Sequence, residues 1–234
     1  MIRIGGHWGY SIGSQDMRRI AIILTSVLLA GCSLFGFLFD NRDNRLEEVR
    51  VFHAGENEPY RRHVYQYEDA VATGRTTFDG SDNEEWTTEY SYNSDSQWSG
   101  GIRYDTSNAK ISSFFLRYNS AGDVSEIEYF DADGVTTLKI VYTYAAGFLE
   151  RGDRYDGNDD AFGYLEFATD TEGNILERRR YSKLGTLLDY REISYDADGN
   201  RIRVDEYDAN DELTKVITFR YELGTPLPNA WVVS

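Results

Sequence analysis

The chain of 234 residues has little of what most catalytic sites and disulfide scaffolds require: one cysteine and three histidines. A single cysteine excludes a disulfide framework, so a secreted domain of this sequence must be stabilised by strand pairing and packing. Basic residues are also few, 24 against 40 acidic ones, and the net charge is -16. Because a surface of that sign repels phosphate backbones, the composition argues against a nucleic-acid partner.

Aromatic residues, in contrast, are abundant for so acidic a chain. They make up 15% of the sequence and include 18 tyrosines, whereas proline occurs only three times. Disordered acidic segments are usually poor in aromatics, so this composition predicts a folded chain. Tyr, Thr, Val, Ile and Phe favour a pleated, half-buried surface, and we therefore expect an all-β fold.

An export signal precedes this body. Met17-Arg18-Arg19 is followed by the apolar run 20–30 and then by Gly31-Cys32, the basic start, apolar stretch and small-residue cleavage site of a signal peptide. The apolar run is shorter than the roughly 20 residues that a membrane-spanning helix needs. We expect residues 1–31 to be removed, and we expect translation to begin at Met17.

The stretch Leu29-Ala30-Gly31-Cys32 resembles the lipobox of bacterial lipoproteins. The resemblance implies that the Cys32 thiol takes a diacylglycerol, that the chain is cut between Gly31 and Cys32, and that the new amine is acylated. Two or three acyl chains make a durable anchor. Ser33 follows the cysteine, where the inner-membrane retention signal would place Asp, so we expect a lipid-anchored protein of the cell envelope, on the outer membrane. Residues 32–45 are then a lipidated tether.

From 46 to 222 the sequence alternates strand-like runs with turn clusters, and we find no helical apolar period. The turn clusters recur about every 12 to 14 residues, which leaves strands of roughly 8 to 10 residues and a hairpin repeat of about 25. We predict about 14 strands in an elongated antiparallel meander of hairpins. Residues 223–234, with Pro226 and Pro228, would cap its open edge.

Turn chemistry and strand alternation support this organisation. Asp-Ala-Asp-Gly at 131–134 and 196–199 places Gly where a positive φ is required and Asp where its side chain bonds back to the turn. Within strands, aromatic residues two apart share one face and polar residues the other, as in Tyr65 and Tyr67, Tyr90 and Tyr92, Tyr142 and Tyr144, and Phe219 and Tyr221.

Three segments, 129–134, 195–202 and 207–213, resemble the YD repeat of rearrangement-hot-spot and teneurin-like proteins, most clearly within 114–222. The resemblance implies a winding β-sheet of repeats, and the large members of that family form a shell around a toxin. This sequence is short, and we expect no additional C-terminal domain. We therefore carry over the β-repeat fold, but neither a closed shell nor toxin delivery.

Candidate chemistry is sparse. His53 and His63 flank the turn 54–59, where they are either a metal pair facing each other across a hairpin or two ordinary surface histidines. No Gly-x-Ser-x-Gly elbow supports a nucleophilic triad. The turn carboxylates offer oxygen ligands for calcium but lack the 12-residue loop, so structural turns are favoured over a metal site at Asp131, Asp133, Asp196 and Asp198. No cofactor is expected.

These observations predict a non-enzymatic, lipid-anchored cell-envelope protein whose acidic, tyrosine-rich β-repeat surface serves as a binding or spacer surface. Tyrosine offers rigid area and a hydroxyl, which suits a protein or glycan partner. The alternative is an envelope glycan hydrolase that uses paired carboxylates among the many acidic residues. A deep pocket with carboxyl groups of raised pKa would favour the hydrolase.

Overall fold

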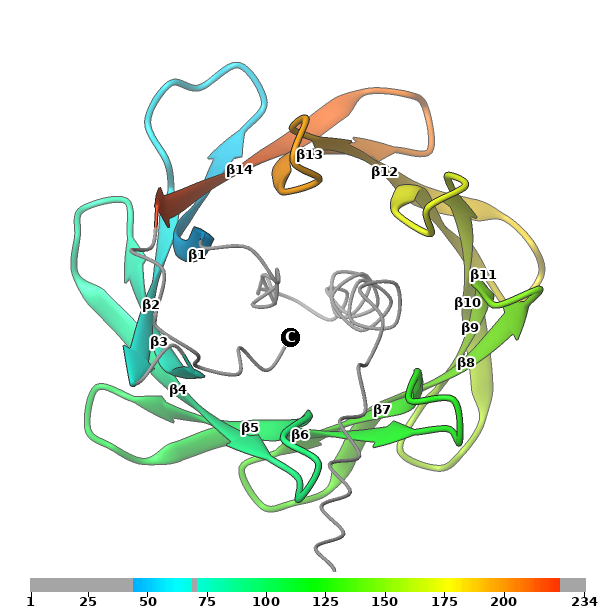
Figure 1. Ribbon diagram of the computed structural model, residues 1–234, viewed down its shortest axis with the longest axis horizontal. Helices are drawn as coiled ribbons and strands as arrows, with labels where there is room; N and C mark the ends of the chain where they lie inside the picture. The colour runs from blue at the N-terminus through cyan, green and yellow to red at the C-terminus, as the bar shows by residue number, and fades with distance from the viewer. Residues whose placement is uncertain (1–43, 69–70, 224–234) are drawn as a thin grey trace, which may run out of the picture.

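The computed structural model describes residues 44–68 and 71–223, which form fourteen antiparallel strands closed into a barrel (Figure 1). The strands are β1 (Asn44–His53), β2 (Arg61–Glu68), β3 (Val71–Asp79), β4 (Glu84–Tyr92), β5 (Trp98–Asp105), β6 (Lys110–Tyr118), β7 (Val124–Asp131), β8 (Thr136–Ala145), β9 (Phe148–Tyr155), β10 (Ala161–Thr169), β11 (Ile175–Ser182), β12 (Leu187–Tyr195), β13 (Arg201–Asp208) and β14 (Leu213–Leu223). In the part of the chain that is described, no helix has the length and apolar character needed to cross a membrane.

Each strand pairs with its neighbours in the chain, and β1 also pairs with β14, with Val49 opposite Phe219. The predicted all-β class, strand number and antiparallel order are confirmed, but the open meander is wrong. Closure removes the two unpaired edges that an open sheet would expose. Curvature comes from β-bulges, since thirteen of the fourteen strand pairs contain a register shift. The predicted signal, residues 32–43 of the predicted tether and residues 224–234 of the predicted edge cap lie outside the described residues. Asn44 and Arg45, predicted as the end of the tether, belong to β1, and Leu223, predicted as the start of the cap, ends β14.

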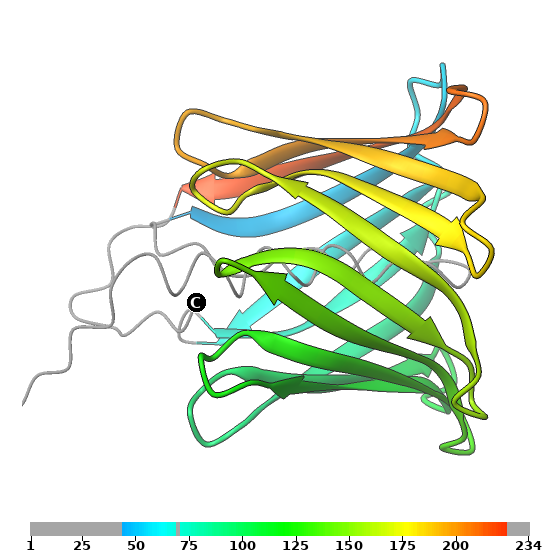
Figure 2. The ribbon, with the colours of Figure 1, turned by 90° about the vertical axis from the view of Figure 1, so that its right-hand side faces the viewer.

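The barrel has two different ends (Figure 2). We call the end where β1 begins and β14 ends the proximal end. The opposite end, which contains the β1–β2 turn, is the distal end. Even-numbered strands run towards the proximal end and odd-numbered strands towards the distal end. The position of a residue in its strand therefore tells which end of the barrel it lies near.

Most turns at both ends share one construction. In the turn 196–200, Asp196 Oδ1 accepts hydrogen bonds from the N–H groups of Asp198 at 2.9 Å and Asn200 at 2.8 Å, and Gly199 has a φ of 83°. The predicted roles of Gly134 and Gly199 are thus confirmed. The same pair of side-chain bonds occurs in nine turns, which begin at Asp79, Asn93, Asp105, Asn119, Asp131, Asp156, Asp170, Asp196 and Asp208.

A ring of tyrosines lines the inner wall at the proximal end. Each stands near the end of an even-numbered strand and donates its hydroxyl to a carbonyl oxygen at the start of the preceding odd-numbered strand, as Tyr195 does to Ile175 at 2.9 Å. The position recurs about every 26 residues, one hairpin repeat. Six repeats have this bond, from Tyr67, Tyr92, Tyr118, Tyr144, Tyr195 and Tyr221, and the corresponding residue of β10 is Thr169.

The predicted aromatic face is therefore the inner face. Tyr65, Tyr142 and Phe219 are buried there with Trp98 and Phe114. Tyrosines of the outer face occupy other positions, and two pairs stack across neighbouring strands, Tyr164 on Tyr181 and Tyr190 on Tyr207. The side of the sheet that we expected to display its aromatics is turned away from solvent.

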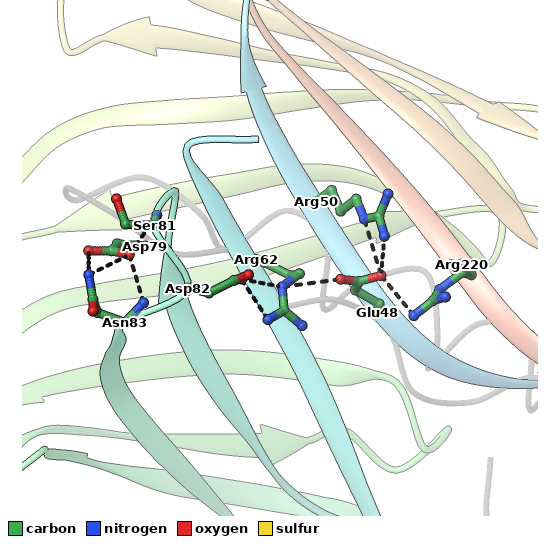
Figure 3. A network of polar contacts seen from close by, with 8 residues as sticks. All are labelled: Glu48, Arg50, Arg62, Asp79, Ser81, Asp82, Asn83 and Arg220. Atoms are coloured by element: carbon green, nitrogen blue, oxygen red, sulfur yellow. Dashed lines mark hydrogen bonds and ion pairs between the residues drawn. The ribbon is translucent and has the colours of Figure 1, made fainter. Parts of the chain in front are cut away.

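The seam between the first and last strands carries a charged cluster on the outer wall (Figure 3). The Glu48 side chain is only 2% exposed and forms ion pairs with Arg50 at 3.0 Å, Arg62 at 3.4 Å and Arg220 at 2.9 Å. Arg62 continues to Asp82 at 2.8 Å. One carboxylate thus connects β1, β2 and β14 where the barrel closes.

Candidate functional site

The inner wall is rich in cations although the chain as a whole has a net charge of -16. Strand alternation places basic residues at inward positions from the middle of the barrel to its distal end. They are Arg61, Arg75, Arg103, Arg154, Arg178, Arg180, Arg191 and Lys215. The carboxylates Asp189 and Glu206 lie among them, and Glu85 pairs with Arg61 at 2.8 Å. The acidic character of the sequence therefore does not describe the interior.

One group of these residues forms what we call the arginine belt, defined as Arg154, Arg178, Arg180, Asp189, Arg191, Glu206 and Lys215. Strand register brings most of its members together: Arg178 lies opposite Arg191, and Arg180 opposite Asp189. On the next strands, Glu206 lies opposite both Arg191 and Lys215. The belt thus crosses the inner faces of β11 to β14, and Arg154 extends it to β9.

The two carboxylates hold the belt together. Asp189 accepts hydrogen bonds from Arg178 Nη2 at 2.6 Å and from Arg180 Nε at 2.6 Å. Glu206 accepts from Arg191 Nε at 2.7 Å and from Lys215 at 3.3 Å. Four cations pair with these two carboxylates and Arg154 is a fifth, so the belt has more cations than carboxylates.

Arg178 is the most deeply buried member, with a side chain 1% exposed. Its Nε and Nη1 have no acceptor among the described residues, and the same holds for Nε of Arg154. Burial lowers the pKa of Arg178 well below its usual range, and the nearby Arg191 charge adds to this effect. Burial, together with Arg180, also lowers the pKa of Arg154 to about 10. Both cations therefore lie where an added negative charge would be stabilising.

The charges of the belt lower the pKa of the Glu206 carboxyl group. Burial alone would raise its pKa, but the charges of Arg191, Lys215 and Arg178 outweigh burial and lower the pKa to about 2. Such a group stays ionised, whereas the acid of a glycoside hydrolase needs a raised pKa. Glu206 is suited to binding cations in the wall and not to donating a proton.

The opposite wall combines cations with aromatic rings. Strands seven positions apart in the barrel order face each other, so β4 and β5 lie across from β11 and β12. There the guanidinium carbons of Arg61 and Arg103 lie 4.7 and 5.1 Å from the centre of the Trp86 ring. Nearer the proximal end, Trp98 packs edge-on against Tyr90 and Phe114, with ring centroids 4.6 and 5.5 Å apart.

The structure does not bring the two histidines together. His53 stacks on Tyr60 with ring centroids 4.0 Å apart, whereas His63 is buried, lies opposite Val49 and shares a 2.8 Å hydrogen bond between Nδ1 and Thr77 Oγ1. Burial lowers the pKa of His63 well below its usual value, and nearby arginines lower it further. The geometry offers no two-histidine metal pair.

The candidate calcium ligands take part in turn construction. Asp131 and Asp196 each use Oδ1 to accept two backbone N–H groups of their own turn. Asp196 and Asp198 also line a groove of about 590 Å³ at the proximal end, between the β10–β11 and β12–β13 turns. Within the described ranges, no group of three or more His, Cys, Asp or Glu side chains is placed to hold a metal ion.

Cys32 and Gly31 lie outside the described residues, and the belt was not among the residues singled out from the sequence. A signal for it exists. Arg178 and Arg180, and Asp189 and Arg191, have the spacing of two that marks one face of a strand, and the latter pair shares its face with the apolar Ile193 and the inward Tyr195. Charged residues in phase with an apolar face indicate a polar interior site.

Neither a protein-family model nor a curated protein matches the chain. Among solved structures, the chain is similar to the Tc holotoxin pore of Photorhabdus luminescens, with 12% identity over 69% of this chain and 10% of that chain and a TM-score of 0.32. It is also similar to a porin-like protein from Bacteroides uniformis, with 12% identity over 76% of this chain and 98% of that chain and a TM-score of 0.42. A DUF1329 family protein from Desulfovibrio piger matches with 7% identity over 79% and 86% of the two chains and a TM-score of 0.32. At TM-scores below 0.5, these similarities assign the chain to none of the three groups.

Proposed function

We propose that this chain is a non-enzymatic binding protein of the cell envelope, anchored by lipid on Cys32, and that its binding surface is the inner wall of the barrel. The observation that carries the proposal is the arginine belt, with five buried or half-buried cations around two carboxylates. Buried charge of one sign is costly unless a partner compensates it. A binding role accounts for these buried cations, whereas a simple spacer would not need them.

The position of the anchor fits such a role. Cys32 precedes Asn44, the first residue of β1, by about 12 residues, which reach at most roughly 40 Å when extended. The lipid would therefore hold the proximal end near the membrane, with the distal mouth and its cations directed away from it. This orientation leaves the basic mouth open to ligands in the surrounding water.

The outer wall also favours a barrel that lies in water beside the membrane. Ion pairs stand on it, such as Arg117 with Glu126 and Arg151 with Asp153. Charged side chains that face lipid cost about 2 to 4 kcal/mol near the centre of a bilayer for Arg or Lys. Attachment through an acylated cysteine leaves all of these charges hydrated.

The turn geometry supports the finer proposal that the barrel is built from YD-like repeats. In Tyr195-Asp196 the tyrosine faces inward and donates a hydrogen bond to the neighbouring strand β11, and the aspartate begins the next turn. Tyr207-Asp208 repeats the dipeptide at the distal end with the tyrosine on the outer wall. The Tyr-Asp signature thus has a structural role at both ends.

Metabolic labelling with a fatty-acid probe tests the anchor. Wild-type protein should be labelled and recovered with membranes, Cys32→Ala should be unlabelled and released, and Ser33→Ala should behave as wild type. Native mass spectrometry of protein purified from membranes tests the binding role and should show a non-covalent mass that is lost on denaturation. Labelling of Cys32→Ala as strong as that of wild type would contradict the proposed anchor. Protein that never carries a ligand would contradict the proposed binding role.

A further inference from the structure

We propose that the arginine belt binds an oxyanion, a carboxylate, phosphate or sulfate group carried by a small molecule that enters through the distal mouth. The inference rests on the proposed function only in taking the inner wall as the binding surface. It adds the chemical class of the ligand and the residues that bind it. The lipid anchor has no part in it.

The charges of the belt do not balance. Arg178 and Arg180 share Asp189, while Arg191 and Lys215 share Glu206. Arg154 extends the same surface, and no carboxylate of the described residues lies within ion-pairing distance of it. A ligand with two or more negative charges would neutralise most of the excess, where the low dielectric of the wall strengthens the attraction.

Buried hydrogen-bond donors of the belt also point to a ligand. Arg178 presents Nε and Nη1, and Arg154 presents Nε, with no acceptor in the described part of the chain. A guanidinium offers its N–H groups in a planar fork that matches the oxygens of carboxylate and phosphate. The ligand would thus provide the acceptors that these buried donors lack.

Arg154 is held in place by a contact that does not neutralise it. Its guanidinium carbon lies 4.5 Å from the centre of the Phe162 ring, at the distal end of the barrel. Stacking on an aromatic ring orients the planar group and leaves its charge available. Arg154 can therefore meet an incoming anion first, ahead of the deeper Arg178.

The barrel also has the width for a small ligand. Fourteen strands spaced about 4.8 Å apart and tilted by roughly 40° place facing backbones about 28 Å apart. Opposite the belt stand Trp86, Tyr90 and Trp98. An oxyanion attached to an apolar or planar body would contact both walls, with its charge on the belt and its body on the rings.

Isothermal titration calorimetry on the full chain, with pyrophosphate, citrate and uncharged glucose as probes, tests the site. Pyrophosphate stands for phosphate ligands and citrate for carboxylate ligands. At least one of these anions should bind, and glucose should not. Arg154→Gln and Arg178→Gln should each weaken anion binding about tenfold or more. The matched control is Arg203→Gln, which removes an outer-wall arginine that pairs with Asp205 at 2.8 Å and should change binding less than about twofold.

Thermal unfolding separates a binding site from a structural ion-pair network. Because Arg154 has no carboxylate to leave unpaired, Arg154→Gln should keep or raise the Tm of the free protein while losing the rise that the anion produces in wild type. A lower Tm with unchanged anion binding would assign Arg154 a structural role only. Absence of binding by both anions at about 10 mM, or equal weakening by Arg203→Gln, would overturn the proposal. Anion binding that persists in unlabelled Cys32→Ala protein would leave this inference standing even if the anchor fails.

Discussion

Removal of the Glu48 carboxylate should weaken the closure of the barrel more than removal of any other outer-wall acid. The perturbation is Glu48→Ala, at the bulge where β1 meets both β14 and β2. The side chain is 2% exposed and is surrounded by Arg50, Arg62 and Arg220. The substitution leaves three guanidinium groups close together without the carboxylate that binds them.

The magnitude follows from exposure. Loss of one partner from a fully buried ion pair costs about 3 to 5 kcal/mol, whereas exposed pairs contribute about 0 to 1 kcal/mol. Here the carboxylate is buried, but the side chains of Arg50, Arg62 and Arg220 are 47%, 27% and 56% exposed and can recover hydration. We therefore expect Glu48→Ala to lower the free energy of unfolding by about 2 kcal/mol, between the two limits.

Urea unfolding followed by far-UV circular dichroism measures this change. The matched control is Glu47→Ala, which removes a neighbouring carboxylate that is 42% exposed and pairs with the same Arg220 at 2.9 Å. The control should cost no more than about 0.5 kcal/mol. Equal losses for the two variants would refute the reasoning, because the effect would then follow from net charge and not from the buried seam.

Two further variants test the repeat itself. Tyr195→Phe should lower the free energy of unfolding by about 1 kcal/mol, because the Ile175 carbonyl loses its 2.9 Å donor. Tyr190→Phe on the outer wall should change the free energy of unfolding by less than about 0.5 kcal/mol. Equal effects in chemical denaturation would show that the ring of proximal tyrosines does not stabilise the barrel through these bonds. Gly199→Val should lower the free energy of unfolding by about 1 to 3 kcal/mol, because the φ of 83° is strained for a branched residue. Ala197→Val in the same turn should be nearly neutral. A Gly199→Val protein as stable as wild type would contradict the turn assignment.

The features that sequence reasoning identified correctly are local. The Asp-Ala-Asp-Gly turns fix their own geometry through bonds between residues two and four apart, so composition and spacing suffice to find them. The aromatic alternation in β2, β4 and β8 likewise follows from strand geometry alone. The number of strands, about fourteen, follows from extending the turn spacing of about 12 to 14 residues over residues 46–222.

Closure depends on contacts that no local pattern contains. Glu47 and Arg220 meet across 173 residues of sequence, and Val49 pairs with Phe219 only because the accumulated curvature of the bulged strands brings β14 back to β1. A bulge is one extra residue in a strand, and the sequence marks it by no consistent residue type. An open sheet and a closed barrel therefore share the same local signals, and we could not separate them from sequence.

The candidate site was missed for a different reason, which lies in the use of net charge. The total of -16 pools the charges of both walls, so it hides the cations that gather on the inner one. The Asx turns fix the phase of each strand: Tyr195, just before Asp196, faces inward, so Ile193, Arg191 and Asp189 do as well. At the distal turns the relation is reversed, because Tyr207, just before Asp208, faces outward. Counting back from a turn therefore assigns the preceding residues to a wall once the end of the barrel is known. For a barrel of repeats, the charges of the inner wall alone are the relevant guide to a ligand, and here they support the anion that we propose.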